Sequence, residues 1–257
     1  MARFKGFVEE DRWKILLMAD SGHGKTGLMS TLANAGHRVC LMNFEDGLSI
    51  LGSYLNDVGM NFMHYMAIND DEQNRKSAWG RFVDVVTNGW KDEDEDLGKI
   101  RDWGPETTLV LDPLNYLGAS ALKVALSEKG KKLDAFPDLR EWGESQRRLK
   151  YKLETLTSPI FKCNLIVTAH LRESTDDFGR ITLSPATGTG SALSTDVGGM
   201  FNDVWTIDVN RKGERTIQTQ SGGKLACLKC SAPNVLKANE VFDLAEIYKK
   251  VGRGKFE

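Results

Sequence analysis

The sequence lacks any long hydrophobic run. None of its apolar stretches approaches the ~20 residues that a membrane-spanning helix needs, and its first residues contain no long apolar segment of the kind that signal peptides carry. No internal repeat is visible either. These absences argue against a spanning helix, a secretory leader and a repeat architecture, so we expect a cytoplasmic protein with no membrane partner.

Cysteine is scarce, and its four positions do not form a metal-binding pattern. Cys40 and Cys163 lie in apolar, strand-like stretches and are expected to be small core residues. Cys227 and Cys230 have the C-x-x-C spacing, but no second pair and no nearby histidine completes the four ligands of a structural zinc site. We therefore interpret this pair as part of an ordinary strand rather than a metal or redox site.

A strong net charge is also absent. The chain has 34 basic and 36 acidic residues, which gives a net charge of −2. This balance argues against a protein that coats nucleic acid with its whole surface, although a local basic loop can still contact phosphate. The 257 residues, 40% of them hydrophobic, suit one globular domain over 1–257, with an N-terminal segment at 1–12 and a C-terminal helix and basic tail at 236–257.

The chain does contain a phosphate-binding motif. An apolar run at 14–18 is followed by a stretch that fits G-x-x-x-x-G-K-S/T, with Ala in place of the first Gly. Small residues let successive backbone N–H groups turn toward phosphate oxygens, Lys25 can reach the β- and γ-phosphates, and Thr26 can ligate Mg²⁺. The nucleotide-binding residues predicted from this motif are Ala19, Asp20, Ser21, Gly22, His23, Gly24, Lys25, Thr26 and Gly27.

Apolar runs alternate with helical patterns along the rest of the chain, which predicts an α/β fold with a mainly parallel sheet flanked by helices. Strands are expected at 14–18, 37–44, 61–68, 107–111, 164–169 and 203–209, helices at 26–35, 48–55, 71–90, 138–157 and 241–250, and a C-terminal β-hairpin from 215–219 and 224–230. The helix at 138–157 is expected to bury Leu139 on its apolar face. The segment 171–200 is interpreted as a long loop that is functional or mobile.

Three polar residues follow predicted strands and should meet the phosphate loop at one edge of the sheet. Asp112 ends an apolar strand and is the expected second Mg²⁺ ligand. Glu45 is the candidate that activates water, with Asp46 as the competing acid and a helix-capping role as the alternative. His170 is a candidate sensor of the γ-phosphate, the alternative being a simple hydrogen-bonding residue at a strand end.

This arrangement resembles the RecA-like ATPase core, and most of all the short RecA-like ATPases encoded in phage recombination modules. The resemblance rests on the phosphate loop, the segments around Glu45, Asp112 and His170, and the stretch 184–208, which is similar to the family's second DNA-binding loop and following strand. It implies ATP and Mg²⁺ as ligands, Lys25, Glu45 and His170 as catalytic residues, and Thr26 and Asp112 as metal ligands. His170 stands where the family usually has Gln.

The resemblance further implies partners. Cys227–Pro233 is similar to a hairpin that carries a lysine acting across a subunit interface, so Lys229 would serve a neighbouring subunit, with Arg211 and Lys212 as alternatives. Single-stranded DNA would bind loops at 119–137 and 171–200. The residues implied for this contact are Lys123, Lys129, Lys131, Lys132, Arg172 and Arg180, unless the lysines only form a solvated loop.

Three functions are compatible with these residues. The first is an ATPase that binds single-stranded DNA, forms a ring or filament, and assists homologous recombination or strand annealing, beside a single-strand-binding or annealing protein. The second is a RecA-like helicase or loader motor. The third is a nucleotide-gated interaction protein that hydrolyses ATP poorly. Stimulation of ATP turnover by DNA separates the first two from the third.

Overall fold

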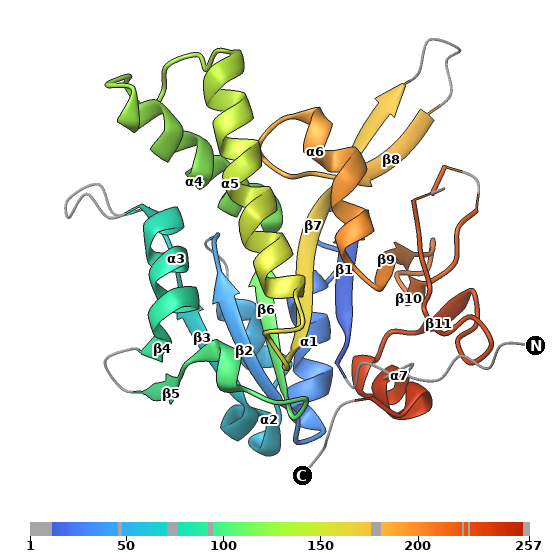
Figure 1. The fold of residues 1–257 in the computed structure, drawn as a ribbon. Coiled ribbons are helices and arrows are strands. Elements are labelled where there is room, and N and C mark those ends of the chain that lie inside the picture. Colours follow the sequence, from blue (N-terminus) through green and yellow to red (C-terminus); the bar gives the residue numbers. More distant parts are fainter. Residues whose placement is uncertain are drawn as a thin grey trace, which may run out of the picture.

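A computed structural model describes residues 12–45, 48–70, 77–91, 95–175, 181–222, 224–225 and 227–253. Its centre is one sheet with the strand order β11-β10-β9-β1-β7-β6-β2-β3, and β8 pairs with the outer part of β7 (Figure 1). The strands are β1 (Lys14–Ala19), β2 (Arg38–Asn43), β3 (Met63–Ala67), β6 (Thr107–Asp112), β7 (Asn164–Thr175), β8 (Ile181–Pro185), β9 (Asp203–Val209), β10 (Arg215–Gln218) and β11 (Asn239–Val241). A separate two-stranded sheet joins β4 (Trp90–Lys91) to β5 (Asp96–Gly98).

The neighbouring strands β9-β1-β7-β6-β2-β3 are parallel, and β10 and β11 continue the sheet in antiparallel pairing. All the side chains of β6 are buried, as expected for a parallel sheet that is covered on both faces. Successive side chains of a strand point to opposite faces. In β1, Leu16 and Met18 therefore enter one apolar cluster, whereas Ile15, Leu17 and Ala19 enter the other.

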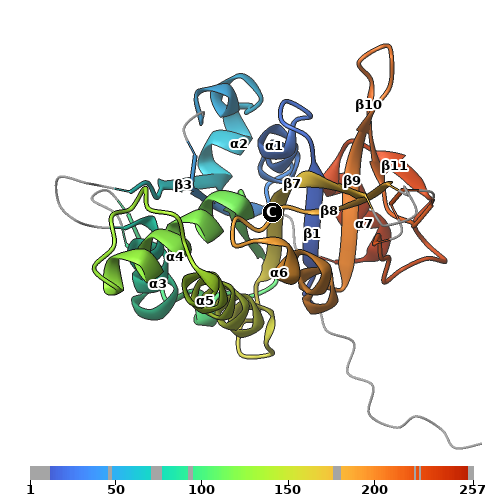
Figure 2. The ribbon, with the colours of Figure 1, turned by 90° about the horizontal axis from the view of Figure 1, so that it is seen from above.

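Helices cover both faces of the sheet, as Figure 2 shows from above. The helices are α1 (Lys25–Asn34), α2 (Asp57–Phe62), α3 (Ala78–Asn88), α4 (Leu114–Glu128), α5 (Leu139–Thr157), α6 (Ser191–Asp196) and α7 (Leu244–Val251), with short 3₁₀ helices at Leu48–Ser53, Ile100–Asp102 and Val197–Met200. Helices α1 and α7 pack in the cluster with Ile15, and α3, α4 and α5 pack in the cluster with Leu16. None of the helices in the described part of the chain is long and apolar enough to cross a membrane.

The fold class predicted from the sequence is confirmed as α/β, with a mainly parallel central sheet between helices and antiparallel strands near the C-terminus. Cys40 and Cys163 are buried, as predicted. The helix α2 was not predicted. Leu139 was predicted to be buried but is 90% exposed, because it is the first residue of α5 and the buried stripe begins further along the helix.

The predicted loop at 119–137 is wrong in its first half. Helix α4 continues to Glu128, and only residues 129–138, which we call the α4–α5 tip, connect the two helices. Helix α5 begins with a capping box, in which Asp138 accepts hydrogen bonds from the backbone N–H groups of Arg140 and Glu141 while the Glu141 carboxylate accepts one from the Asp138 N–H. This cap fixes the end of the tip.

The segment 171–200 is not a long irregular loop either. Strand β7 runs on past the sheet to Thr175 and pairs with β8, so that 171–175 and 181–185 form the β7–β8 hairpin. The chain then turns back against α4, where a Cβ built on Gly118 would lie 1.7 Å from the Thr187 carbonyl oxygen. Glycine at 118 permits this close approach. The Thr189 carbonyl oxygen accepts a hydrogen bond from Gln146 of α5 at 2.7 Å, so the second half of the segment is packed.

Antiparallel strands near the C-terminus are present, and the predicted strand at 215–219 is β10, but its predicted partner at 224–230 is not a strand in the part of the chain that the structure describes. β10 pairs with β9 and with β11, whereas the described residues of 224–229 make only isolated bridges, one of them between Lys229 and Val204. The true hairpin turn lies at 210–214, where the Asn210 side chain accepts hydrogen bonds from the backbone N–H groups of Lys212 and Glu214. Asn at the start of such a turn is a local signal that the prediction overlooked.

Candidate nucleotide-binding site

The phosphate loop connects β1 to α1, as the motif requires. Ala19 lies inside β1 and pairs with His170 of β7, so its backbone is extended and the replacement of the motif's first Gly by Ala costs no strain. The turn is made instead at Gly22 and Gly24, whose φ angles are +80° and +92°. Glycine adopts this left-handed backbone without the steric cost that a side chain would bring.

Lys25 folds back over the loop that precedes it. Its Nζ donates hydrogen bonds to the carbonyl oxygens of Ala19 at 3.0 Å and Asp20 at 2.9 Å, and the residue is only 7% exposed. Burial lowers the pKa of Lys25, and the nearby carboxylates of Asp112, Glu45 and Asp20 oppose that shift. A buried cation with only neutral oxygens as hydrogen-bond partners is well suited to receive an anion.

Thr26 and Asp112 are in direct contact. The Thr26 hydroxyl donates to one carboxylate oxygen of Asp112 at 2.6 Å, and the hydroxyl of Thr168 in β7 donates to the other. Asp112 is 2% exposed. Mg²⁺ prefers such hard oxygen ligands and is usually held by one or two protein groups together with phosphates. The contact therefore fits a Mg²⁺ site made by Thr26 and Asp112.

Glu45 and His170 complete the edge. Asn43, the last residue of β2, pairs with Asp112, and Glu45 follows two residues later; its Oε2 lies 3.8 Å from Nε2 of His170. Burial and the Asp112 carboxylate raise the pKa of Glu45. Burial and the Lys25 cation lower the pKa of His170. The Glu45 carboxylate is therefore a stronger proton acceptor than usual, and the His170 imidazole beside it favours its neutral form. Asp46, the competing acid, lies outside the described residues.

The structure adds three residues beside the loop that motif spacing did not indicate. A Cβ built on Gly24 would lie 3.1 Å from Cζ of Phe242 and 3.3 Å from Nε of Arg215, and one built on Gly27 would lie 3.1 Å from the ring of Tyr54. Aromatic faces beside a phosphate loop can stack with a base. No spacing rule connects β10, the residue after β11 and the turn after Ser53 to the motif, so only the fold brings them together.

Lys229 lies away from the loop of its own chain. It bridges to Val204, near the start of β9, and its Nζ donates to the Phe201 carbonyl oxygen at 2.8 Å. The loop is at the other end of the parallel strand β1. The alternatives Arg211 and Lys212 are exposed in the turn that follows β9, which is the same sheet edge as the loop because β9 and β1 are parallel; this turn stands out from the molecule in Figure 2.

The residues predicted to contact DNA fall into two groups. Lys123 is on α4 and forms an ion pair with Asp70 at 2.7 Å, and Lys131 forms one with Glu141 at 2.7 Å. Lys129 and Lys132 at the α4–α5 tip and Arg172 on the β7–β8 hairpin are exposed. Arg180 lies outside the described residues.

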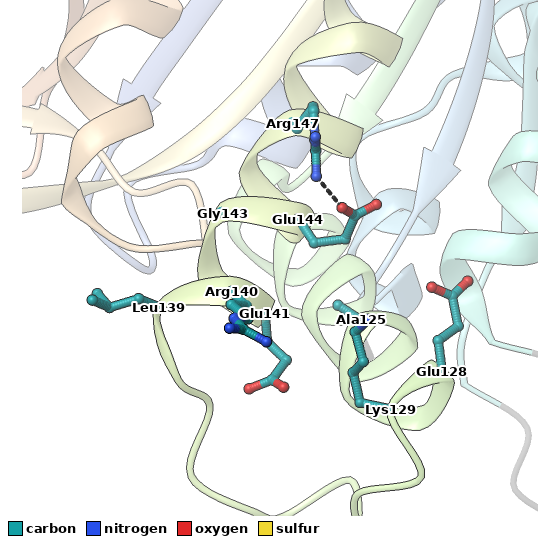
Figure 3. Close-up of a pocket in the computed structure, with 9 residues that line it drawn as sticks. All are labelled: Ala125, Glu128, Lys129, Leu139, Arg140, Glu141, Gly143, Glu144 and Arg147. Atoms are coloured by element: carbon teal, nitrogen blue, oxygen red, sulfur yellow. Dashed lines mark hydrogen bonds and ion pairs between the residues drawn. The ribbon is translucent and has the colours of Figure 1, made fainter.

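A hollow of about 700 Å³ lies between the end of α4 and the start of α5 (Figure 3). Its walls carry charges of both signs, including the Glu144–Arg147 ion pair. None of the phosphate-loop residues, Glu45, Asp112 or His170 lines this hollow, so it is separate from the candidate site.

The fold and the site define an ATPase domain of the P-loop class, with a phosphate loop, a buried strand-end aspartate and a strand-end glutamate at one sheet edge. The chain belongs to the AAA domain family, which it matches over residues 11–225. A search of curated proteins found no match.

Several solved structures are similar to parts of this chain. An ATPase of the type III secretion system of pathogenic bacteria is 16% identical with a TM-score of 0.49, covering 78% of this chain and 52% of its own. The RadB recombinase is 15% identical with a TM-score of 0.39, covering 80% and 79%. Assembled EscN of enteropathogenic E. coli is 15% identical with a TM-score of 0.47, covering 90% and 46%. The chain thus spans about half the length of the two secretion ATPases.

Proposed function

We propose that this ATPase hydrolyses ATP with Mg²⁺, binds single-stranded DNA and assists homologous recombination or strand annealing. The observation that carries the proposal is the convergence of Lys25, Thr26, Asp112, Glu45 and His170 at one sheet edge. We further propose that the chain is a single cytoplasmic domain of the short phage-encoded RecA-like type, and that a single-strand-binding or annealing protein works beside it.

The residues of the edge divide the chemistry among them. Lys25 and the backbone N–H groups at the start of α1 bind the phosphates. Mg²⁺, held by Thr26 and Asp112, would neutralise charge that develops on the phosphate oxygens. Glu45 accepts a proton from the attacking water, and its raised pKa suits a general base.

His170 connects this chemistry to a surface element. It lies in β7 beside Glu45, and the same strand continues directly into the β7–β8 hairpin. A change in the hydrogen bonds of His170 on loss of the γ-phosphate would shift the base of the hairpin. This geometry supports coupling between nucleotide state and whatever the hairpin contacts.

Two elements that project beyond the nucleotide edge support DNA binding. The α4–α5 tip and the β7–β8 hairpin both lie at the top of the view in Figure 1. The tip carries exposed Lys129 and Lys132 together with Phe136, which is 96% exposed, and the hairpin carries Arg172. Cations beside an aromatic face suit single-stranded nucleic acid, because bases stack and phosphates pair with the cations.

A neighbouring copy would complete the site in a ring or filament. We propose that a cation from the adjacent subunit contacts the triphosphate. Arg211 and Lys212 are better placed for this role than Lys229, because their exposed turn lies at the nucleotide edge whereas Lys229 is bonded to Phe201. Lys229 remains the alternative.

The decisive experiment measures ATP turnover with and without single-stranded DNA in the wild type, Lys25→Ala and Glu45→Gln. We expect DNA to stimulate the wild type, Lys25→Ala to lose nucleotide binding, and Glu45→Gln to bind ATP without turnover. Turnover indifferent to DNA would favour the nucleotide-gated interaction protein. Duplex unwinding without annealing would favour the helicase or loader. Equal turnover in wild type and Glu45→Gln would remove Glu45 from the mechanism.

A further inference from the structure

Arg215 reaches the phosphate loop from the side opposite the carboxylates. It is the first residue of β10, which pairs with β9, and β9 pairs with β1. Strands β7, β6 and β2 lie on the other side of β1. β7 contains His170, β6 ends at Asp112, and β2 ends two residues before Glu45. The Arg215 side chain nevertheless approaches Gly24, since a Cβ built there would lie 3.3 Å from its Nε.

The Arg215 side chain is partly buried, and its Nε has no hydrogen-bond partner among the described residues. Its guanidinium carbon lies 5.7 Å from the centroid of the Phe242 ring, a cation–π distance. Its Nε is buried and makes no hydrogen bond, and none of the acidic residues that the structure describes forms an ion pair with it. Buried donors in folded proteins are nearly always paired, and a charged donor left unpaired is costly.

This unpaired donor lies where other positive charge has already gathered, so an anion would be favourable there. Gly24 is the N-cap of α1, a helix of ten residues, and the N-terminus of a helix carries partial positive charge. Lys25 adds a full positive charge in the same turn. Arg215 is thus the third source of positive potential here, after the helix N-terminus and Lys25. A phosphate group could interact favourably with all three at once.

We propose that Arg215 is a nucleotide-binding residue that contacts the phosphate chain in its own subunit, from the β10 side. This inference rests on the nucleotide site proposed above. The γ-phosphate belongs beside Glu45 and His170, so Arg215, on the opposite side of β1, meets the phosphates nearer the nucleoside. A group that contacts these phosphates binds ATP and ADP alike, so its loss raises KM and leaves kcat nearly unchanged.

The test compares Arg215→Gln and Arg215→Lys with the wild type by titration with a fluorescent ADP analogue, competed by ADP and by inorganic pyrophosphate. Loss of one charge-assisted contact corresponds to a fall in affinity of about 10- to 100-fold. We expect Arg215→Gln to show this fall for both ADP and pyrophosphate, with KM for ATP rising by a similar factor, and Arg215→Lys to recover part of it. Arg101→Gln, at an exposed arginine with 57% of its side chain accessible, is the matched control and should bind as the wild type does.

Three results would overturn the assignment: unchanged affinity in Arg215→Gln, a loss confined to ADP with pyrophosphate unaffected, or a fall in kcat with KM unchanged. The second would place Arg215 on the nucleoside. Failure of the proposed function itself would look different, because the wild type would then bind neither ADP nor pyrophosphate. Thermal unfolding of each variant separates lost binding from lost structure.

Discussion

The nucleotide edge of the sheet and the projecting α4–α5 tip differ in what fixes their polar side chains. At the edge, Lys25 and Asp112 are almost fully buried, and parallel pairing of neighbouring strands sets their positions. At the tip, Lys132 and Phe136 are exposed, while Lys131 is turned inward by Glu141. At the nucleotide edge, strand register therefore determines where the polar side chains lie. At the α4–α5 tip, ion pairs determine which of the described lysines remain available for a ligand.

The largest effect should come from the buried carboxylate of the edge. Asp112→Asn replaces with a neutral amide the carboxylate that accepts hydrogen bonds from Thr26 and Thr168. This carboxylate is also one of the two groups expected to hold Mg²⁺. We expect ATP turnover to fall by about 10²- to 10³-fold, the range seen when a preorganised electrostatic group is removed. Asp102→Asn, at a 70% exposed side chain, is the control, and equal turnover in both variants would contradict the role of Asp112.

At the tip, the free and the paired lysines should behave differently. The double variant Lys129→Ala/Lys132→Ala should weaken single-stranded DNA binding, and the slope of log K against log salt should become shallower by about 1.4 if both cations contact phosphate. Lys123→Ala should leave the slope unchanged, because Lys123 is paired with Asp70. Binding isotherms at several salt concentrations measure both. A larger change in slope for Lys123→Ala would reverse the assignment.

Phe136→Ala should give a smaller loss. A stacked base contributes about 1–3 kcal/mol, so we expect DNA affinity to fall at least about fivefold. Because Phe136 is 96% exposed, the midpoint of thermal unfolding should not change. Unaltered DNA affinity in fluorescence titrations would show that the tip contacts the backbone alone or no DNA at all.

The smallest effect concerns stability and pH. Burial raises the pKa of Glu45 in the folded protein, so its titration stabilises the fold at low pH, and this contribution is lost as the pH rises through the raised pKa. Above that pH, Glu45→Gln should melt about 1 °C higher than the wild type without nucleotide, a small shift because Glu45 is partly solvated. The difference should vanish in acid. Calorimetry at pH 4 and 8 tests it, and a lower melting temperature for Glu45→Gln at pH 8 would refute it.

The edge could be predicted from sequence because its information is local. Lys25 and Thr26 lie in one motif, and Asp112 and His170 each end an apolar run, so strand ends of a parallel sheet bring them together. The only geometric doubt, Ala19 in place of Gly, is resolved by its position inside β1.

The parts that sequence could not supply depend on contacts between distant residues. The pairing of Lys123 with Asp70 spans 53 positions, and the approach of Arg215 to Gly24 requires the completed sheet. No sequence pattern indicates that the Thr187 backbone packs against Gly118, which is why 171–200 was interpreted as a loop. The strand at 215–219 was predicted correctly as β10, but its partner was not, because β10 pairs with β9 and with a strand 21 residues farther along, and a β-strand pattern does not identify the strand it pairs with.

The most direct test of the central claim is a structure of the protein with Mg²⁺ and a non-hydrolysable ATP analogue. The account predicts the β- and γ-phosphates over the loop, with Lys25 on the phosphates, the metal on Thr26 and Asp112, and Glu45 facing the γ-phosphate across one water molecule. Phosphates bound elsewhere, or a Glu45 carboxylate turned away with no room for water before the γ-phosphate, would contradict it.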